Sequence, residues 1–200
     1  MHPDEATGDD TGGGTPPPPP GEAEAAASPG LVWHLLEDFR MEFQVQTNWC
    51  WAAVATSVDA YYRHGTGAPM PMCEVANSEL GRTDCCTTGA AGPCNVYGTL
   101  ASALFRVGHG GKWGYKVVAN RQHLATEIDN LKPLCFRTAA PGGGAHFIAA
   151  IGHLPGSGAT PEQDRVAIAD SWNGSSDMPY DMMKTGYTTG ICTDTYYTRP

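Results

Sequence analysis

Cys50 is the residue whose type and position best suit chemistry. It stands between Trp49 and Trp51, at the start of an apolar run that continues to His64 with helical spacing. The first turn of a helix carries unpaired backbone N–H groups and the positive end of the helix dipole, and both stabilise a thiolate. The sequence therefore places Cys50 where a nucleophilic cysteine would lie, although a buried cysteine at a helix start also occurs as simple packing.

Two polar residues far along the chain could complete a catalytic site. His146 begins a continuous apolar segment that ends at Leu154 and is typical of a buried strand, and Asp170 lies near the end of the next such segment, residues 165–172. If these are neighbouring antiparallel strands, Asp170 can orient the imidazole of His146, and His146 can take the proton of Cys50. A histidine in an apolar strand is otherwise a hydrogen-bonded core residue, so the hypothesis depends on all three residues meeting.

Gln44 precedes the cysteine by six residues and is a candidate for a supporting role. Its side-chain amide, together with the backbone N–H of Cys50, could donate hydrogen bonds to the negative oxygen that forms when a thiolate attacks a carbonyl group. Gln46 is the alternative if the register differs. Trp51 and Trp172 are candidates for substrate binding, and their simplest interpretation is as aromatic residues of the core.

The elements that must position these residues are helical in the first half of the chain and strands in the second. Residues 50–64 predict a central buried helix capped by Thr47 or Asn48, and Asn95 is expected to cap a helix that ends at Gly108. The expected fold class is α+β, with an N-terminal helical lobe whose central nucleophile helix packs on a C-terminal antiparallel β-sheet lobe. Further helices are expected at residues 73–80 and 120–131. The expected strands are residues 115–118, 133–138, 146–154, 165–172, 179–184 and 193–198, the last two as edge strands.

Residues 1–30 differ from the rest in composition. They contain a glycine-rich stretch, five consecutive prolines and six acidic residues, with no lysine or arginine. Such a segment buries too little apolar surface to offset the entropy lost on ordering. We therefore expect a disordered Gly/Pro/acidic N-terminal extension followed by one domain over residues 31–200.

The charge and hydropathy patterns bear on partners and location. The net charge is −9 and the basic residues form no cluster, which argues against binding to nucleic acid. No apolar run approaches the roughly 18 residues of a membrane span, and the first residues lack the basic and apolar regions of a signal peptide. We expect a monomer that acts on a peptide or protein, with neither nucleic acid nor a membrane as its partner.

Seven cysteines leave six besides Cys50. If these six form disulfides, an oxidising compartment and a secreted or exported protein are slightly favoured, but they could equally be reduced, and their pairing cannot be read from the sequence. A zinc site is disfavoured because Cys-x2-Cys pairs are missing, and disulfides that tie the loop at 81–93 to its flanking helices are favoured. The six are Cys73, Cys85, Cys86, Cys94, Cys135 and Cys192. The histidines with no assigned role are His34, His64, His109 and His123.

Three segments of the chain resemble papain-like cysteine proteases. Gln44-x5-Cys50-Trp51-Ala52 resembles their oxyanion-glutamine and nucleophile segment. The segment from His146 to Gly152 resembles their histidine strand, and Asp170-Ser171-Trp172-Asn173-Gly174 resembles their Asn-Ser-Trp-Gly segment with Asp in the orienting position. The Cys-Trp-Ala-Ala sequence is closest to a small bacterial branch that includes plant-pathogen effector proteases and is similar to bacteriocin leader peptidases.

This resemblance implies a papain-like fold and a role for each candidate residue. Cys50 would be the nucleophile, His146 the general base and acid, Asp170 the orienting residue and Gln44 the oxyanion donor, while Trp172 would shield the hydrogen bond between histidine and aspartate from water. The implied activity is that of a cysteine peptidase, which hydrolyses peptide bonds through a thioester and needs neither a metal nor an organic cofactor. Self-cleavage in the glycines at 12–14 is a further hypothesis, for which a plain tether is the simpler interpretation.

The sequence also departs from the papain pattern. Cys50 is preceded by Asn48 and Trp49, where cathepsin-like enzymes have Gly-Ser. Cys50 and His146 are 96 residues apart, fewer than the roughly 130–150 of papain-like enzymes. The region 84–95 has no counterpart in papain. Subsite specificity therefore cannot be transferred from the resemblance.

Two other functions stay open at this point. Transglutaminases use Cys, His and Asp in the same order to transfer an acyl group to an amine, but the glutamine before the cysteine favours the protease. A non-catalytic, cysteine-rich interaction module on the same scaffold is the second alternative. The complete set of Gln44, Cys50, His146 and Asp170 argues against it.

Overall fold

The computed structural model describes residues 31–88, 92–156, 163–188 and 190–200. These residues form an α+β fold built on a seven-stranded antiparallel sheet, as predicted. The extension at 1–30 lies outside the described residues. The helices are α1 (Cys50–Tyr62), α2 (Met72–Leu80), α3 (Cys85–Thr88), α4 (Leu100–Arg106), α5 (Arg121–Asp129) and α6 (Tyr180–Gly186). The strands are β1 (His34–Leu35), β2 (Gly110–Gly114), β3 (Leu134–Ala139), β4 (Ala145–Leu154), β5 (Arg165–Asp170), β6 (Gly174–Pro179) and β7 (Ile191–Thr198).

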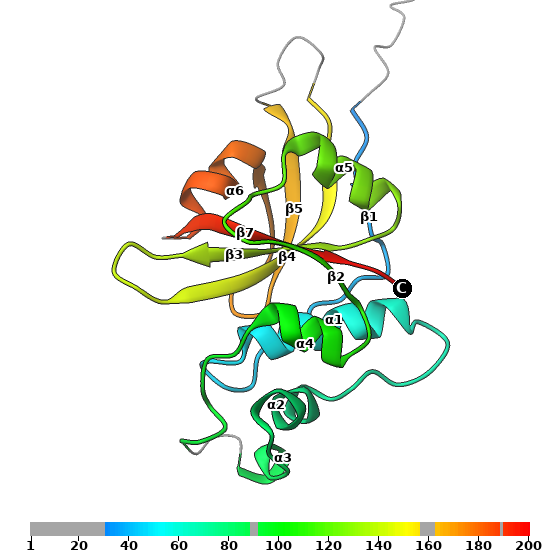
Figure 1. Cartoon of the computed structure of the whole chain (residues 1–200). Helices are drawn as coiled ribbons and strands as arrows, with labels where there is room; N and C mark the ends of the chain where they lie inside the picture. Colours follow the sequence, from blue (N-terminus) through cyan, green and yellow to red (C-terminus); the bar gives the residue numbers. More distant parts are fainter. Residues whose placement is uncertain (1–30, 89–91, 157–162, 189) are drawn as a thin grey trace, which may run out of the picture. The chain divides into compact units, whose positions relative to one another are not determined.

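The sheet has the order β2-β7-β3-β4-β5-β6, and the short strand β1 pairs with the far end of β4. Figure 1 shows helices α1 to α4 gathered on one side of the molecule, at the lower end of the sheet, with α5 and α6 beside the upper part of β5. Helix α1 packs on β4, the strand that carries His146. None of the described helices is long and apolar enough to cross a bilayer.

Helix α1 forms the centre of the core. Its residues from Cys50 to Asp59 are all buried, and Trp49 and Trp51 are among the largest fully buried side chains. Alanines at 52, 53 and 55 keep this helix narrow, so that neighbouring elements approach it closely. The indole of Trp51 lies against Gly98, where an added Cβ would be 2.5 Å from the ring. The residue next to the predicted nucleophile is therefore fixed by packing.

The start of α1 lies at the predicted residue, but its predicted cap is wrong. Trp49 occupies the N-cap position and no side chain caps the helix. The Asn48 side chain instead donates to the carbonyl of Asn95 (2.8 Å), while the Asn48 backbone N–H donates to the Asn95 side chain (2.9 Å). Asn95 is thus not a helix cap either, and α4 begins five residues later, at Leu100.

Two strand predictions at the end of the chain also need correction. Residues 179–184 do not form an edge strand, because β6 ends at Pro179 and helix α6 follows at once. Residues 193–198 do belong to a strand, β7, but it lies between β2 and β3 rather than at an edge. Residues 115–118 are not a strand, since β2 ends at Gly114 and Lys116 has a φ of +53°. By contrast, Asn120 caps α5 as predicted, accepting the N–H of His123 at 2.9 Å.

The contact between Trp51 and Gly98 yields a stability prediction. Gly98→Ala should lower the free energy of unfolding by about 1–3 kcal/mol, because a buried indole in a packed core cannot move aside for the new methyl group. Urea denaturation measures this. Gly67→Ala is the matched control, since nothing lies within 4 Å of its added Cβ. Equal stability of the two variants would contradict the close packing described here.

Candidate active site

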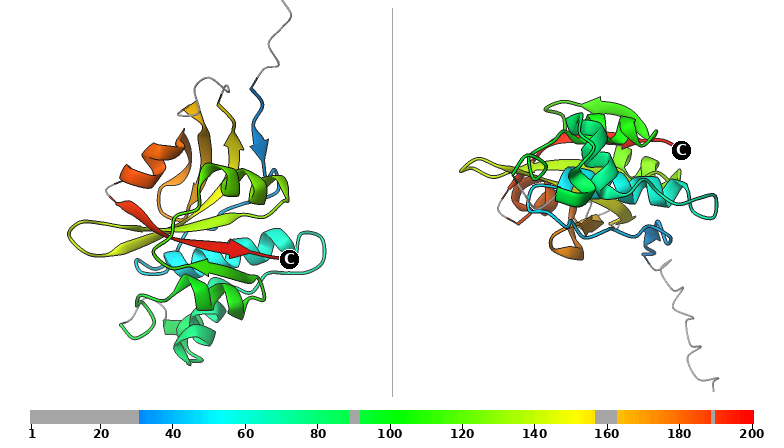
Figure 2. Two further views of the ribbon diagram at one scale, coloured as in Figure 1. Left: turned by 45° about the horizontal axis from the view of Figure 1, so that its top comes forward. Right: turned by 90° about the horizontal axis from the view of Figure 1, so that it is seen from below.

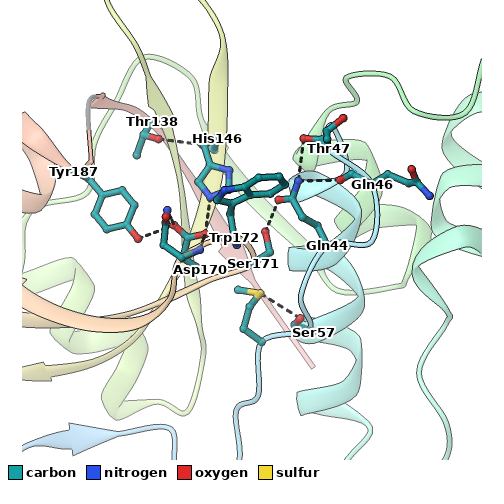
Figure 3. A network of polar contacts seen from close by, with 12 residues as sticks. Gln44, Gln46, Thr47, Ser57, Thr138, His146, Asp170, Ser171, Trp172 and Tyr187 are labelled. Atoms are coloured by element: carbon teal, nitrogen blue, oxygen red, sulfur yellow. Dashed lines mark hydrogen bonds and ion pairs between the residues drawn. The ribbon is translucent and has the colours of Figure 1, made fainter. Parts of the chain in front are cut away.

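The imidazole of His146 and the carboxylate of Asp170 meet on one face of the sheet. Asp170 in β5 pairs with Ile148 in β4, and His146 lies two residues from Ile148 on the same face. His146 Nε2 is 2.7 Å from Asp170 Oδ1, as Figure 3 shows. This is the contact that the strand pattern predicts. Asp170 is fully buried, whereas about a quarter (24%) of the His146 side chain is exposed, so the pair can be reached from one side.

Asp170 is surrounded by hydrogen-bond donors. Besides His146, its carboxylate accepts the backbone N–H groups of Trp172 (2.7 Å) and Asn173 (3.1 Å), the Asn173 side-chain amide (2.9 Å) and the hydroxyl of Tyr187 (2.6 Å). Burial by itself would raise the pKa of Asp170, but the bonds from His146, Tyr187 and Asn173 outweigh it and hold that pKa well below its usual range. The carboxylate therefore stays ionised, which an orienting residue requires.

The position of His146 favours its protonated form. Burial would lower the pKa of His146, but its hydrogen bonds and charge interactions with Asp170 and Cys50 outweigh burial and raise the pKa to about 9. Because Asp170 occupies Nε2, Nδ1 is the ring nitrogen left to face the thiol. At neutral pH the site thus presents an imidazolium between a carboxylate and a buried cysteine.

Tyr187 is a member of the site that sequence reasoning missed. It lies between α6 and β7, and its buried hydroxyl donates to Asp170 Oδ2. Burial and then the neighbouring Asp170 carboxylate raise the pKa of Tyr187, so the phenol keeps its proton and remains a donor. No local pattern identifies a tyrosine 17 residues after the aspartate as its partner. Only the tertiary fold brings them together.

Gln44 lies in the loop before α1 and connects that loop to Ser171, the residue after β5. Its backbone N–H donates to the carbonyl of Ser171 (3.0 Å), and its side-chain oxygen accepts the Ser171 hydroxyl (2.9 Å). Its amide nitrogen donates to the carbonyls of Gln46 and Thr47, both at 2.9 Å. In Figure 3 the Gln46 side chain points away from His146, which favours Gln44 over Gln46 as the predicted oxyanion donor. To donate to a substrate oxygen, the Gln44 side-chain amide would have to give up one of these two hydrogen bonds to backbone carbonyls.

The two tryptophans named as candidates for substrate binding differ in exposure. Trp172 is 59% exposed, so its ring is accessible beside the Asp170 network to which its backbone N–H belongs. Trp51 is fully buried, and its indole N–H donates to the carbonyl of Val96 at 3.2 Å. A ring with no exposed surface cannot contact a substrate directly. The prediction for Trp51 is therefore replaced by a role in packing.

The segment 94–96 makes hydrogen bonds to the residues on both sides of Cys50, the predicted nucleophile. The indole N–H of Trp49 donates to the carbonyl of Cys94 at 2.7 Å, and that of Trp51 to the carbonyl of Val96. Asn95 adds the two bonds to Asn48 described above and a third, from its amide to the Thr47 hydroxyl at 2.9 Å. We call this set of contacts the 94–96 brace. It does the work expected of a helix cap, because it fixes the chain just before Cys50.

Two disulfides fasten this brace. Cys85 is bonded to Cys94 and Cys73 to Cys86, so the loop at 81–93 is tied to α2 and to the brace, in line with the favoured interpretation of these cysteines. The zinc alternative is excluded for these four thiols, because all are oxidised. A third disulfide is not formed. Cys135 and Cys192 are free and buried, and they lie on opposite faces of the sheet because Cys192 pairs with Thr138, three residues from Cys135.

A cavity of about 420 Å³ lies on the opposite face of β4 from His146. Gly98, which packs on Trp51, forms part of its wall, and so does Phe147, which follows His146. The rest of the wall is mixed: Trp113, Tyr115 and Tyr196 are aromatic, and Lys116, Arg137 and Asp194 are charged. The predicted catalytic residues do not line this cavity.

Comparison with known proteins agrees with this geometry. The family model described as "Papain-like cysteine protease AvrRpt2" matches residues 34–184. The matched segment includes Gln44, Cys50, His146 and Asp170, and it ends just before Tyr187. A search of curated proteins gives no match.

The network around Asp170 makes a prediction about protonation. In Asp170→Asn the pKa of His146 should fall from about 9, because the negative charge beside it is lost while the burial that lowers the pKa remains. Tyr187→Phe should change it much less, since the carboxylate stays. NMR titration of the His146 imidazole signals in the parent protein and the two variants measures both changes. A pKa of His146 that is equal in all three proteins would refute the assigned network.

Proposed function

The chain belongs to the AvrRpt2 family of papain-like cysteine proteases. On this premise we propose that it is a peptidase that cleaves peptide bonds through an acyl-enzyme on Cys50. The observation that carries the proposal is the position of His146, whose imidazole interacts with both Asp170 and Cys50 and has a raised pKa. A cysteine beside an imidazolium is held as the reactive thiolate.

In the proposed reaction, the Cys50 thiolate attacks the peptide carbonyl carbon, and a C–S bond forms as the carbonyl oxygen becomes an oxyanion. The His146 imidazolium then protonates the leaving amine as the C–N bond breaks, which leaves a thioester. In the second half, His146 removes a proton from water, the resulting hydroxide attacks the thioester, and the C–S bond breaks. The carboxylic acid leaves, and the thiolate–imidazolium pair is restored.

The supporting residues act on charge and orientation. Asp170 holds the imidazole through Nε2 and stabilises its positive charge, and Tyr187 and Asn173 keep Asp170 in place. The Cys50 backbone N–H and the Gln44 amide are the proposed oxyanion donors, each worth about 2.7–4 kcal/mol of transition-state stabilisation. Trp172 is proposed to cover the His146–Asp170 bond and to contact the substrate.

The Cys-Trp-Ala-Ala segment supports membership of a bacterial branch close to plant-pathogen effector proteases. The two disulfides support action in an oxidising compartment. We propose that the protein acts there on peptides or proteins, as a monomer.

Selective alkylation tests the nucleophile. Iodoacetamide at low concentration near pH 6 should modify Cys50 and leave Cys135 and Cys192 unmodified, since burial raises the pKa of both to about 12. In His146→Ala the Cys50 modification should slow by about tenfold or more. Peptide mapping by mass spectrometry locates the adduct. Slow, uniform labelling of all three thiols would sink the proposal.

Product analysis separates hydrolysis from its alternatives. With a peptide substrate and an added amine, a peptidase releases mainly the free acid, whereas a transglutaminase-like enzyme releases mainly the amide. A Cys50→Ala protein that keeps full biological activity would favour a non-catalytic interaction module.

The 94–96 brace gives a prediction with a matched control. Loss of either disulfide, in Cys85→Ser/Cys94→Ser or in Cys73→Ser/Cys86→Ser, should cost about 2.5–3 kcal/mol of stability, because the closed loops are of similar length. Only the first pair, however, includes a residue that contacts the nucleophile segment. Its loss should slow Cys50 alkylation by about tenfold, since small displacements of a reactive group cost much of its rate.

Alkylation rates and urea denaturation of the two double variants decide this point. Equal alkylation rates in both variants would show that the brace does not position Cys50.

A further inference from the structure

A second cluster of ligand-type side chains lies at the opposite end of β4 from the catalytic residues. His34 in β1, Asp129 at the end of α5 and His153 in β4 converge there, and Figure 2 shows β1 beside α5 and the end of β4. His153 is seven residues along the strand from His146, or roughly 20 Å or more. The cluster is therefore a separate feature from the catalytic site.

Each of the three side chains contributes one ligand-type atom to the cluster. His34 Nδ1 is 2.7 Å and His153 Nε2 is 3.0 Å from the same oxygen, Asp129 Oδ1. The three atoms all lie within 4.8 Å of one another. In a tetrahedral zinc site with ligands at about 2.0–2.1 Å, neighbouring ligand atoms are about 3.3 Å apart. The two spacings to Asp129 Oδ1, 2.7 and 3.0 Å, are shorter than that value, so small rotations that separate the side chains would admit the ion.

The chemistry of the three residues narrows the choice of ion. Two imidazole nitrogens and one carboxylate oxygen suit zinc and neighbouring transition metals, whereas calcium and magnesium need more oxygen ligands. Asp129 Oδ1 already lies within hydrogen-bond distance of one nitrogen of each imidazole, so the three ligand-type atoms face one another.

The cluster is open to solvent on one side and anchored in the sheet on the other. The side chains of His34 and Asp129 are each 47% exposed, which leaves a path for the ion and room for a water as fourth ligand, while that of His153 is only 11% exposed and is held by the strand. Strand β1 consists of two residues and pairs with β4 at His153 and Gly152. A metal held by one residue from each of three elements would fasten this short strand and α5 to the sheet.

We propose that His34, Asp129 and His153 form a divalent transition-metal site, with zinc as its preferred physiological ion. The site binds the metal through three protein ligands and one water. Its role is structural, because it joins β1, α5 and β4 away from the catalytic cysteine. Metal binding at this site does not depend on the proposed peptidase chemistry, so the two proposals can be tested separately.

The test uses the full chain carrying Cys50→Ala, so that zinc cannot bind the catalytic thiol. Calorimetric titration with zinc chloride at pH 7.5 should give one site, and Tm should rise by roughly 5–10 °C when free zinc is about 100 times Kd. EDTA should reverse the shift. His34→Gln and Asp129→Asn should each weaken binding by tenfold or more, and cobalt(II) bound in place of zinc should show the visible absorption of tetrahedral coordination.

His123→Gln is the matched control, since His123 is an exposed histidine of the same helix, α5, and lies outside the cluster. It should bind zinc as the parent protein does. His34 and Asp129 are half exposed, so their substitution should leave the fold intact, which the Tm of the metal-free variants will show. Zinc affinity unchanged in His34→Gln and Asp129→Asn, or no zinc binding by the parent protein, would overturn the proposal.

Discussion

The packing of helix α1 on strand β4 is the contact on which the site depends. It brings Cys50 to His146 across 96 residues of sequence. Two hydrogen bonds between Gln44 and Ser171 also connect the loop before α1 to the end of β5. Because Ser171 directly follows Asp170, these bonds connect the segment before Cys50 with the carboxylate that contacts His146. The relative position of thiol, imidazole and carboxylate is thus set by the tertiary core rather than by any one segment.

The start of α1 shows how such a helix is held without a side-chain cap. The residues just before Cys50 are bound to the segment 94–96 through the indoles of Trp49 and Trp51 and the paired side chains of Asn48 and Asn95. A capping side chain would lie at the N-terminal end of the helix, near the space where a substrate carbonyl would arrive in the proposed reaction. Support from a neighbouring segment leaves that space open. The disulfide at Cys94 then limits the motion of the support itself.

The fold class and the central residues could be predicted from the sequence because each has a local cause. The apolar runs of β4 and β5, the helical spacing of α1 and the Asn120 cap are visible in short windows. The errors have tertiary causes. Asn48 and Asn95 read as caps because asparagine often caps helices, but here each satisfies the other's backbone. The sequence predicts a strand at residues 179–184, but Pro179 and the packing of Tyr180 begin a helix. Tyr187 and the cluster of His34, Asp129 and His153 depend on contacts that no window contains.

The three free thiols separate burial from reactivity. Cys50, Cys135 and Cys192 are all buried, and burial alone disfavours a thiolate because a charge is costly to remove from water. Cys135 and Cys192 show that effect, with each pKa raised to about 12. Cys50 differs in its neighbour, an imidazole that Asp170 holds in the charged form. The charge of Asp170 in turn persists in the core because its donors replace the water it has lost. The reactivity proposed for one cysteine therefore begins with the hydrogen bonds of a carboxylate that never touches it.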